Sequence, residues 1–533
     1  MNLRSIVALT FASLVASGAN AELPSLSVSN YLRYGEGEEI QNTRDSYKKY
    51  FEEMLSFNIH WGNFLAGGRY EHDDPSEFGL DHRTMRKWFL EYRRGPWKVR
   101  GGTFAALFSR GMVMNAYEED TIGHDSEITG VNVLYETGGT TVNLLAGKLD
   151  YEKIPDFENI VEYDIRGGSV RRRIFEWCDF GGSYMRGDVS QERGFYKIAD
   201  GFYAHAAEIW SEFTTDMFQV HAVMASNDLT GDKLFVSGRN SIYASFSGTL
   251  PSTAMTLEYK NYKFGVTTPD NRDDDLRHRR MLAFQNPPTA IKEFSWTLLS
   301  RRTHNVNFND EVGAQLDVYH SLSPETTLNF NAAVAGRQYR YERTRNYRFV
   351  RRDDSMTWLP SLAREHSPFW QTYCEAERYF PGGSSVVFGL SYTYEEIYNY
   401  YYPDLREQTR AFIAPIRMLW QLPRSYSLEG TVELQKFKET LHGDTYHSNN
   451  HFILGFGKAP FLSASLEAEY MSENYNYDDQ TIWLNGSIRY RYHSSQIFEV
   501  GYGETRGGLV CTNGQCRYVP EYKGWRFFTE THW

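Results

Sequence analysis

Apolar and polar residues alternate one by one along much of the chain. In residues 54–61, Leu55, Phe57, Ile59 and Trp61 alternate with more polar neighbours, and Gly-Asn follows. Residues 64–71 then repeat the alternation. Because successive side chains of a β-strand point to opposite faces, the pattern predicts a hairpin with one apolar and one mostly polar face.

The same hairpin unit recurs toward the C-terminus, with turns expected near residues 94–96, 138–139, 173–176, 214–216, 250–252, 323–325, 381–383, 422–424, 459–460 and 494–495. In residues 462–470 and 481–492 the second face carries charged residues. A packed sandwich core would not tolerate unpaired charge there. A sandwich could still turn that face to solvent, so alternation alone does not exclude a soluble fold.

The connections between strands distinguish these folds better. Short turns alternate with long polar connections, at residues 35–49, 73–86, 110–127, 188–201, 267–310, 341–367, 398–407 and 507–523. Outer-membrane barrels have short periplasmic turns and long extracellular loops. The sequence therefore predicts an all-β fold, a transmembrane antiparallel up-and-down β-barrel of about 24 strands, within a range of about 20–26.

The last ten residues form a strand pattern of their own. Trp525, Phe527 and Trp533 fall on one side of a period-2 pattern, with Phe528 as the exception on the other. A barrel closes on its last strand and places aromatic residues at the membrane interface. This ending also resembles the C-terminal signal that the barrel-assembly machinery reads in bacterial outer-membrane proteins. The alternative is the terminal strand of a soluble sandwich.

The N-terminus has the features of a secretion signal. A basic start, an apolar stretch over residues 6–16 and an Ala-Asn-Ala site predict a signal peptide at 1–21 and one barrel domain at 22–533. Mean hydropathy is -0.56, and no run of about 18 apolar residues follows that could form a spanning helix. The first strand is expected near Leu26, which leaves no room for an N-terminal plug domain and argues against a TonB-dependent receptor.

The aromatic content and the net charge of the chain indicate which kinds of partner to expect. Aromatic residues make up 16% of the chain, which suits aromatic girdles or a carbohydrate-binding surface. For the tyrosines near residues 392–402 and 475–477, we favour the girdle. The net charge of -12 argues against nucleic acid as a partner.

Four cysteines are present. Cys511 and Cys516 bracket Thr-Asn-Gly-Gln, a sequence suited to a hairpin turn. In an oxidising compartment these two cysteines are expected to form a disulfide, since no second ligand pair suits zinc. Whether Cys178 and Cys374 pair remains open at this stage.

No catalytic motif stands out, and we expect a protein that is not an enzyme, with no cofactor and no metal site. The acidic run at 270–275 lacks the glycine and closing glutamate of an EF-hand loop, so a solvated loop is the simpler interpretation. His304, in a long connection, is the most suggestive histidine, but we expect it to form hydrogen bonds within the fold. The arginine- and tyrosine-rich residues 337–352 suit either an anion-attracting pore or lipopolysaccharide phosphates, or ordinary charge pairing.

Three stretches together resemble a family of large bacterial outer-membrane β-barrel proteins of unknown function. They are residues 102–118, residues 286–313 with Trp296 and His304, and residues 507–520. Where that family tends to have Phe-Gly-Arg-Gly, this chain has Phe108-Ser109-Arg110-Gly111. The resemblance implies a fold and a location but no substrate.

A barrel of this size would leak if its lumen were open. We therefore expect residues 267–310 or 110–127 to fold inward. The first functional hypothesis is a porin-like or gated channel or transporter for a hydrophilic solute in the bacterial outer membrane. The alternative is a surface-exposed binding or adhesion protein anchored by the barrel. Outer-membrane lipid and lipopolysaccharide are the expected surroundings in both cases.

Overall fold

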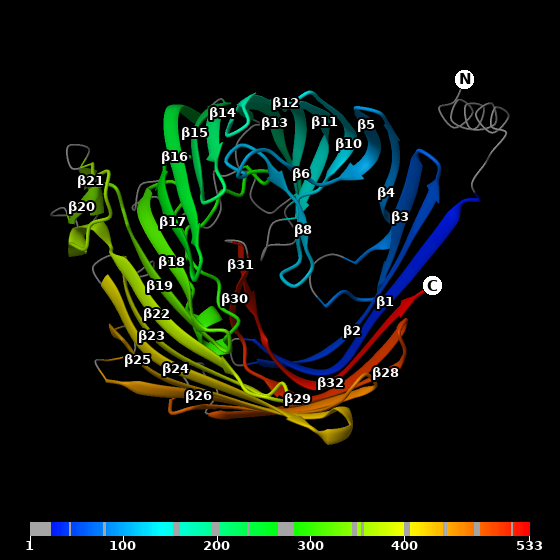
Figure 1. The fold of residues 1–533 in the computed structure, drawn as a ribbon, viewed down its shortest axis with the longest axis vertical. Helices are drawn as coiled ribbons and strands as arrows, with labels where there is room; N and C mark the ends of the chain where they lie inside the picture. Colours follow the sequence, from blue (N-terminus) through cyan, green and yellow to red (C-terminus); the bar gives the residue numbers. More distant parts are fainter. Residues whose placement is uncertain are drawn as a thin grey trace.

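The computed structural model describes residues 23–533 except 42–43, 78–80, 153–159, 194–201, 232–233, 265–281, 344–348, 353–355, 399–405, 441–442, 444, 474–479 and 513–514. A single antiparallel sheet of 24 strands closes into a ring (Figure 1). The fold class and the strand number predicted from the sequence are confirmed.

The first twelve ring strands are β1 (Ser25–Gln41), β2 (Arg44–Trp61), β3 (Phe64–Asp73), β4 (Arg83–Arg94), β5 (Trp97–Phe104), β10 (Ile128–Thr137), β11 (Thr140–Glu152), β12 (Ile160–Phe175), β13 (Cys178–Arg193), β14 (Phe202–Thr214), β15 (Phe218–Gly231) and β16 (Leu234–Leu250).

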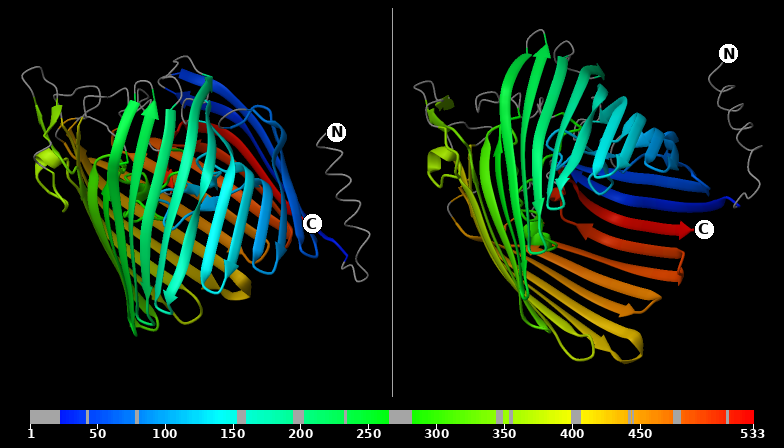
Figure 2. Two further views of the ribbon diagram at one scale, coloured as in Figure 1. Left: turned by 90° about the horizontal axis from the view of Figure 1, so that it is seen from above. Right: turned by 45° about the horizontal axis from the view of Figure 1, so that its top comes forward.

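The other twelve are β17 (Thr253–Tyr262), β18 (Glu311–Ser323), β19 (Thr326–Gly336), β22 (Phe369–Tyr379), β23 (Ser385–Tyr398), β24 (Arg406–Leu422), β25 (Tyr426–Glu439), β26 (His447–Lys458), β27 (Leu462–Met471), β28 (Ile482–His493), β29 (Gln496–Thr505) and β32 (Glu521–His532). Figure 2 shows them running side by side around the wall.

The ring closes where the first strand pairs with the last. The register of β1 and β32 runs from Ser29 opposite His532 to Ile40 opposite Glu521. Val28 and Trp533 extend this seam by exchanging backbone hydrogen bonds of 3.1 and 2.8 Å. The final residue of the chain is therefore part of the closing seam, and no edge of the large sheet stays unpaired there.

The outer face of the wall is apolar and the inner face mostly polar. In β27 and β28, Leu466, Leu484 and Ile488 are exposed on the outside, whereas Glu469 is buried on the inside. Trp525, Phe527 and Trp533 of the predicted assembly signal are all exposed, at 48%, 39% and 66%. The period-2 pattern thus separates an outward apolar face from an inward polar one.

Phe528 breaks the alternation of the last strand for a structural reason. Its ring lies 4.7 Å from that of Tyr31, in an edge-to-face arrangement across the closing seam. The Arg489 guanidinium lies 6.0 Å from the same ring. Phe528 therefore packs on the inner face of the seam.

The two ends of the barrel differ, as the sequence predicted. At one end, which we call the short-turn end, all the expected tight turns are present, including the one between β12 and β13. At the other, the long-loop end, the predicted long connection at 35–49 is wrong, because β1 and β2 pair as far as Gln41 and Arg44. The connection predicted at 188–201 also begins later, since β13 continues to Arg193. Pairing between neighbouring strands therefore continues through these polar residues, and the strands are longer than predicted.

In the residues that the structure describes, four small hairpins are separate from the ring sheet. They are β6 (Ala106–Leu107) with β7 (Asn115–Ala116), β8 (Glu118–Glu119) with β9 (His124–Asp125), β20 (Arg340–Arg343) with β21 (Phe349–Arg352), and β30 (Gly508–Thr512) with β31 (Gln515–Val519). In the described part of the chain, no helix has the length and apolarity needed to cross a membrane.

Candidate functional site

Two long connections from the long-loop end fold into the lumen, and the hairpin β30–β31 also lies inside the ring in Figure 1. We call residues 105–127 the first lumen segment and residues 282–310 the second lumen segment; the latter contains the short helix α3 (Thr297–Ser300). Figure 1 shows β6, β8 and the short helix inside the ring. The expected inward folding is confirmed for both connections, within the residues that the structure describes.

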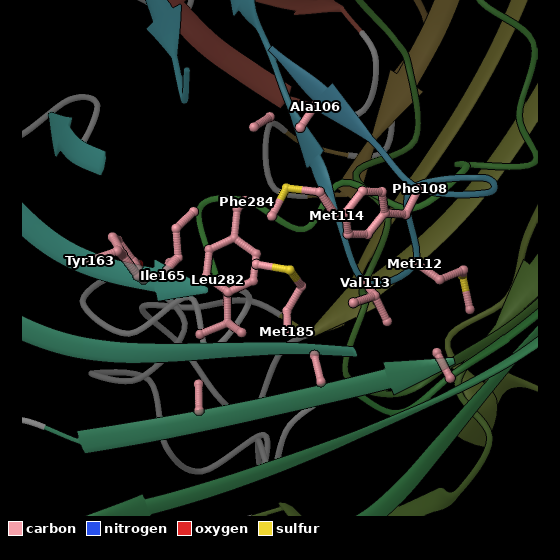
Figure 3. Packing of buried hydrophobic residues seen from close by; sticks show 14 of the residues in the cluster. Ala106, Phe108, Met112, Val113, Met114, Tyr163, Ile165, Met185, Leu282 and Phe284 are labelled. Atoms are coloured by element: carbon pink, nitrogen blue, oxygen red, sulfur yellow. The ribbon is translucent and has the colours of Figure 1, made fainter. Parts of the chain in front are cut away.

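The first lumen segment begins with apolar residues that pack against one side of the wall. Figure 3 shows Phe108, Met112 and Met114 in one cluster with Met185 of β13 and Phe284 of the second lumen segment. These side chains are at most 2% exposed. The inner face of the wall here is apolar as well, which corrects the expectation of a polar lumen; its residues are Leu145, Leu149, Tyr163, Ile165, Met185, Val189, Val223 and Leu229.

The two lumen segments are bonded to each other. The Asn115 backbone N–H donates to the Phe284 carbonyl oxygen at 2.7 Å, and the Asn115 side chain to the Asn286 carbonyl at 3.1 Å. Gln285 Nε2 donates to the Met112 carbonyl at 3.0 Å. The side chain of Gln285 also exchanges two hydrogen bonds with Asn227 of β15. One buried polar junction therefore joins both segments and the wall.

The end of the first lumen segment is held by charge. Lys87 of β4 lies 2.6 Å from carboxylate oxygens of Glu118 and Glu127, and Arg69 of β3 pairs with Glu118. Burial alone would raise the pKa of Glu118, but Arg69 and Lys87 outweigh it and hold that pKa below its usual value. Glu118 is therefore ionised and paired at neutral pH.

The helix of the second lumen segment is fixed to the opposite wall. The Glu433 carboxylate of β25 accepts hydrogen bonds from the backbone N–H groups of Thr297 and Leu298, at 2.9 and 2.8 Å. Trp296 Nε1 donates to Tyr373 Oη at 2.7 Å. Free N–H groups at a helix start need acceptors, and here the barrel wall supplies them.

Two arginines follow the helix and extend this anchor. Arg301 lies 2.5 Å from Glu469 of β27, which also pairs with Arg506 at 2.7 Å. Arg302 lies 2.5 Å from Glu439 at the end of β25. The Glu469 side chain is only 5% exposed, so removing one partner would leave a buried charge unpaired.

His304 sits at the centre of a further buried group. Its Nδ1 lies 2.6 Å from Glu395 of β23 and its Nε2 3.2 Å from Glu311 of β18, which in turn lies 2.6 Å from Lys260 of β17. Burial favours the neutral imidazole, but the two carboxylates outweigh it and raise the pKa of His304 to about 9. The sequence-based expectation that His304 bonds within the fold is confirmed.

Sequence reasoning did not identify one further group of neighbouring polar side chains. Ser109 Oγ lies 3.2 Å from His221 Nε2, and His221 Nδ1 lies 3.3 Å from a carboxylate oxygen of Glu212. Ser109 has a φ of 47°, in the left-handed region. More than 100 residues separate Ser109 from His221, and no motif surrounds either of them. Only the departure from the family pattern at Ser109 drew attention to this position.

Other predicted sites have mixed outcomes. Cys178 and Cys374 are both free cysteines. The hairpin register places Cys511 opposite Cys516, but their side chains lie outside the described part, and the disulfide stays a prediction. The acidic run at 270–275 and most tyrosines of the proposed girdle lie outside the described residues too. Hairpin β20–β21 projects beyond the barrel wall in Figures 1 and 2 and does not line the lumen there.

Several solved structures are similar to this chain in architecture. The P pilus usher PapC translocation pore matches with a TM-score of 0.41 and 10% identity, covering 96% of this chain and 99% of that one. The siderophore receptor PirA of Pseudomonas aeruginosa matches with 0.45 and 9%, covering 96% and 81%. OccK11 (OpdR) of the same organism matches with 0.36 and 13%, covering 74% and 96%.

No match is found among curated proteins. A family model does match, over residues 2–532, which is nearly the whole chain. Its description is "Family of unknown function (DUF6029)". The chain, a closed 24-stranded β-barrel with connections folded into its lumen, therefore belongs to the DUF6029 family.

Proposed function

We propose that this protein is a gated outer-membrane channel or transporter for a hydrophilic solute. The exposed apolar outer face is suited to contact with lipid, and the closed ring leaves no backbone edge there. Secretion through the predicted signal peptide and insertion by the barrel-assembly machinery are part of this proposal. Trp525, Phe527 and Trp533 would be read during insertion.

The observation that carries the proposal is the course of the second lumen segment. Phe284 contacts Tyr163 of β12, with ring centroids 5.8 Å apart, and Arg301 contacts Glu469 of β27. In the ring these two strands are separated by a dozen others, so the segment crosses a large part of the lumen. A cross-piece held by discrete ion pairs and hydrogen bonds is a suitable gate, because those contacts can open without unfolding the wall.

Polar residues on β22, β23, β25 and β26, the strands around the anchor of this segment, support a hydrophilic solute. Gln371, Thr393, Gln435 and Asn449 all lie on the inner side and are buried. A channel takes its selectivity from the groups that line it, and amide and hydroxyl groups favour solutes that form hydrogen bonds.

The test is conductance in planar bilayers for the refolded wild type and the Glu433→Ala variant. Without the carboxylate, two N–H groups of the helix and His451 lose their acceptor, at a cost of about 3 kcal/mol. A shift of that size changes an open–closed equilibrium about a hundredfold. Glu433→Ala should therefore open far more often than the wild type.

Glu499→Ala is the matched control. Glu499 pairs with Arg489 on the wall at 2.6 Å, and no described contact joins it to either lumen segment. It should conduct like the wild type. If folded Glu433→Ala is as silent as the wild type, the channel proposal fails, and the surface-binding alternative becomes the better one.

A further inference from the structure

A serine of the first lumen segment meets a histidine and a glutamate that lie opposite each other in the β14–β15 hairpin, inside the barrel. Ser109 lies in the first lumen segment, His221 near the start of β15, and Glu212 near the end of β14. The two ring nitrogens of His221 face the two oxygens: Nε2 lies 3.2 Å from Ser109 Oγ, and Nδ1 3.3 Å from Glu212 Oε2. This is the order of nucleophile, base and orienting carboxylate in serine hydrolases, which are recognised by geometry and not by sequence position.

The surroundings hold the histidine and leave the serine accessible. His221 is 2% exposed, and its ring stacks on Trp210 with centroids 5.8 Å apart. Ser109 is only half-buried, and the next residue, Arg110, is exposed. The Glu212 carboxylate is close to Nδ1 but is not aligned for a hydrogen bond. Such bonds are commonly long in unliganded sites and tighten when substrate binds.

The backbone at Ser109 supports a functional role for this side chain. Its φ of 47° belongs to a tight turn in which the Gly111 N–H donates to the Phe108 carbonyl at 2.9 Å. Glycine adopts this conformation without steric cost, whereas other residues adopt it rarely. Strained residues cluster at active sites, where the surrounding packing maintains them. The buried ring of Phe108 provides that packing.

We propose that Ser109, His221 and Glu212 form a hydrolytic site for carboxylic esters within the lumen. Ser109 Oγ attacks the ester carbonyl carbon and its proton passes to His221 Nε2. The bond to the alcohol then breaks, and the alcohol leaves with that proton. Water next attacks the acyl carbon, giving one proton to His221, which returns it to Ser109 Oγ as the acid departs. Ser109 and His221 are the catalytic residues, and Glu212 is a positioning residue.

The first experiment is covalent labelling of the folded, full-length barrel with a fluorophosphonate, followed by peptide mass spectrometry. The label should be found on Ser109. His221→Gln should slow labelling by about a hundredfold or more, the usual contribution of a general base. Glu212→Gln should slow it less, and Glu212→Asp should retain part of the rate because it keeps a carboxylate.

Two variants keep this test interpretable. Ser109→Gly relaxes the turn, so it should remain folded, as judged by heat-modifiable gel mobility, yet lose the label. His320→Gln is the matched control, because His320 also lies close to a hydroxyl, 2.9 Å from that of Thr253, but outside the proposed site. This variant should be labelled like the wild type. The same variants should rank identically in hydrolysis of p-nitrophenyl butyrate. Absence of label from folded wild type, or equal labelling of His221→Gln, would overturn the proposal.

Discussion

The two lumen segments start from the same end of the barrel but are held in different ways. The first lumen segment packs mainly through a large apolar cluster that includes Phe108 and Met112, and ion pairs to Glu118 hold only its end. The second lumen segment crosses to the far wall, where Glu433, Glu469 and Glu395 bind it through charge and hydrogen bonds beside a smaller apolar cluster around its helix. Apolar packing is insensitive to pH and salt, whereas ion pairs respond to both.

This difference assigns the segments different roles. A segment held mainly by non-directional packing is a permanent lining, because displacing it exposes apolar surface to water. A segment held by directional polar contacts has alternative partners in water and is easier to release. We therefore expect the second lumen segment to control conductance and the first to stabilise the wall.

The largest expected effect comes from deleting the segments one at a time. Replacing residues 284–307 by a short Gly-Ser linker should increase single-channel conductance several-fold, because the cross-piece is removed. Replacing residues 106–126 in the same way should change conductance less. Planar-bilayer recordings of both refolded variants measure this. If replacing residues 106–126 raised the conductance more than replacing residues 284–307, the roles assigned to the two segments would be reversed.

A smaller effect, on stability alone, is expected from Phe108→Ala. The side chain is 1% exposed, so its truncation should lower the free energy of unfolding by about 3–5 kcal/mol. Urea titration in detergent micelles, followed by tryptophan fluorescence at low and high salt, measures the loss. It should be equal at both salt concentrations. Leu107→Ala is the control, because Leu107 is 59% exposed and its loss should cost within about 0.5 kcal/mol.

The smallest effect is a pH response of the second lumen segment. Among the described residues, three groups contact His304 directly: Glu311 of β18, Glu395 of β23 and the stacked ring of Phe369 of β22. Lys260 of β17 pairs with Glu311 on its other side. Because the folded pKa of about 9 lies above the ordinary 6.5, the charged histidine stabilises the closed segment fully below about pH 6.5. That contribution, on the order of 3 kcal/mol, is lost as pH rises through about 9.

Channel opening should therefore increase between pH 7 and pH 10 in bilayer recordings. His304→Gln should open readily at pH 7 and show little further change. If the variant keeps the pH response of the wild type, another group controls it. The prediction would also fail if conductance fell as pH increased.

Local patterns were sufficient to predict the wall. Alternation in residues 462–470 and 481–492 identified the outward face, and each expected tight turn was found. The errors fell at the long-loop end, where residues 35–49 contain no strong turn signal and strand pairing continued through polar residues. Where such strands end depends on hydrogen bonding to the neighbouring strand. The sequence of one strand alone does not show this contribution.

The lumen illustrates the limit of prediction from sequence. Length and polarity indicated that residues 110–127 and 267–310 were candidates for inward folding, but not which wall each would contact. The pairs Arg301–Glu469 and Ser109–His221 join residues more than 100 positions apart. No sequence pattern marks Glu433 or Glu212. Each gains its role because the fold places another group beside it: the helix N–H groups beside Glu433, and His221 beside Glu212.

The sequence by itself determined the barrel, its strand number and its apolar outer face. These follow from a period of two residues, which each strand carries within itself. Only the tertiary structure decided how the lumen is filled, that part of its wall is apolar, and that Ser109 meets the distant pair His221 and Glu212. Those features depend on contacts between remote segments, and the closed ring must form before such contacts exist.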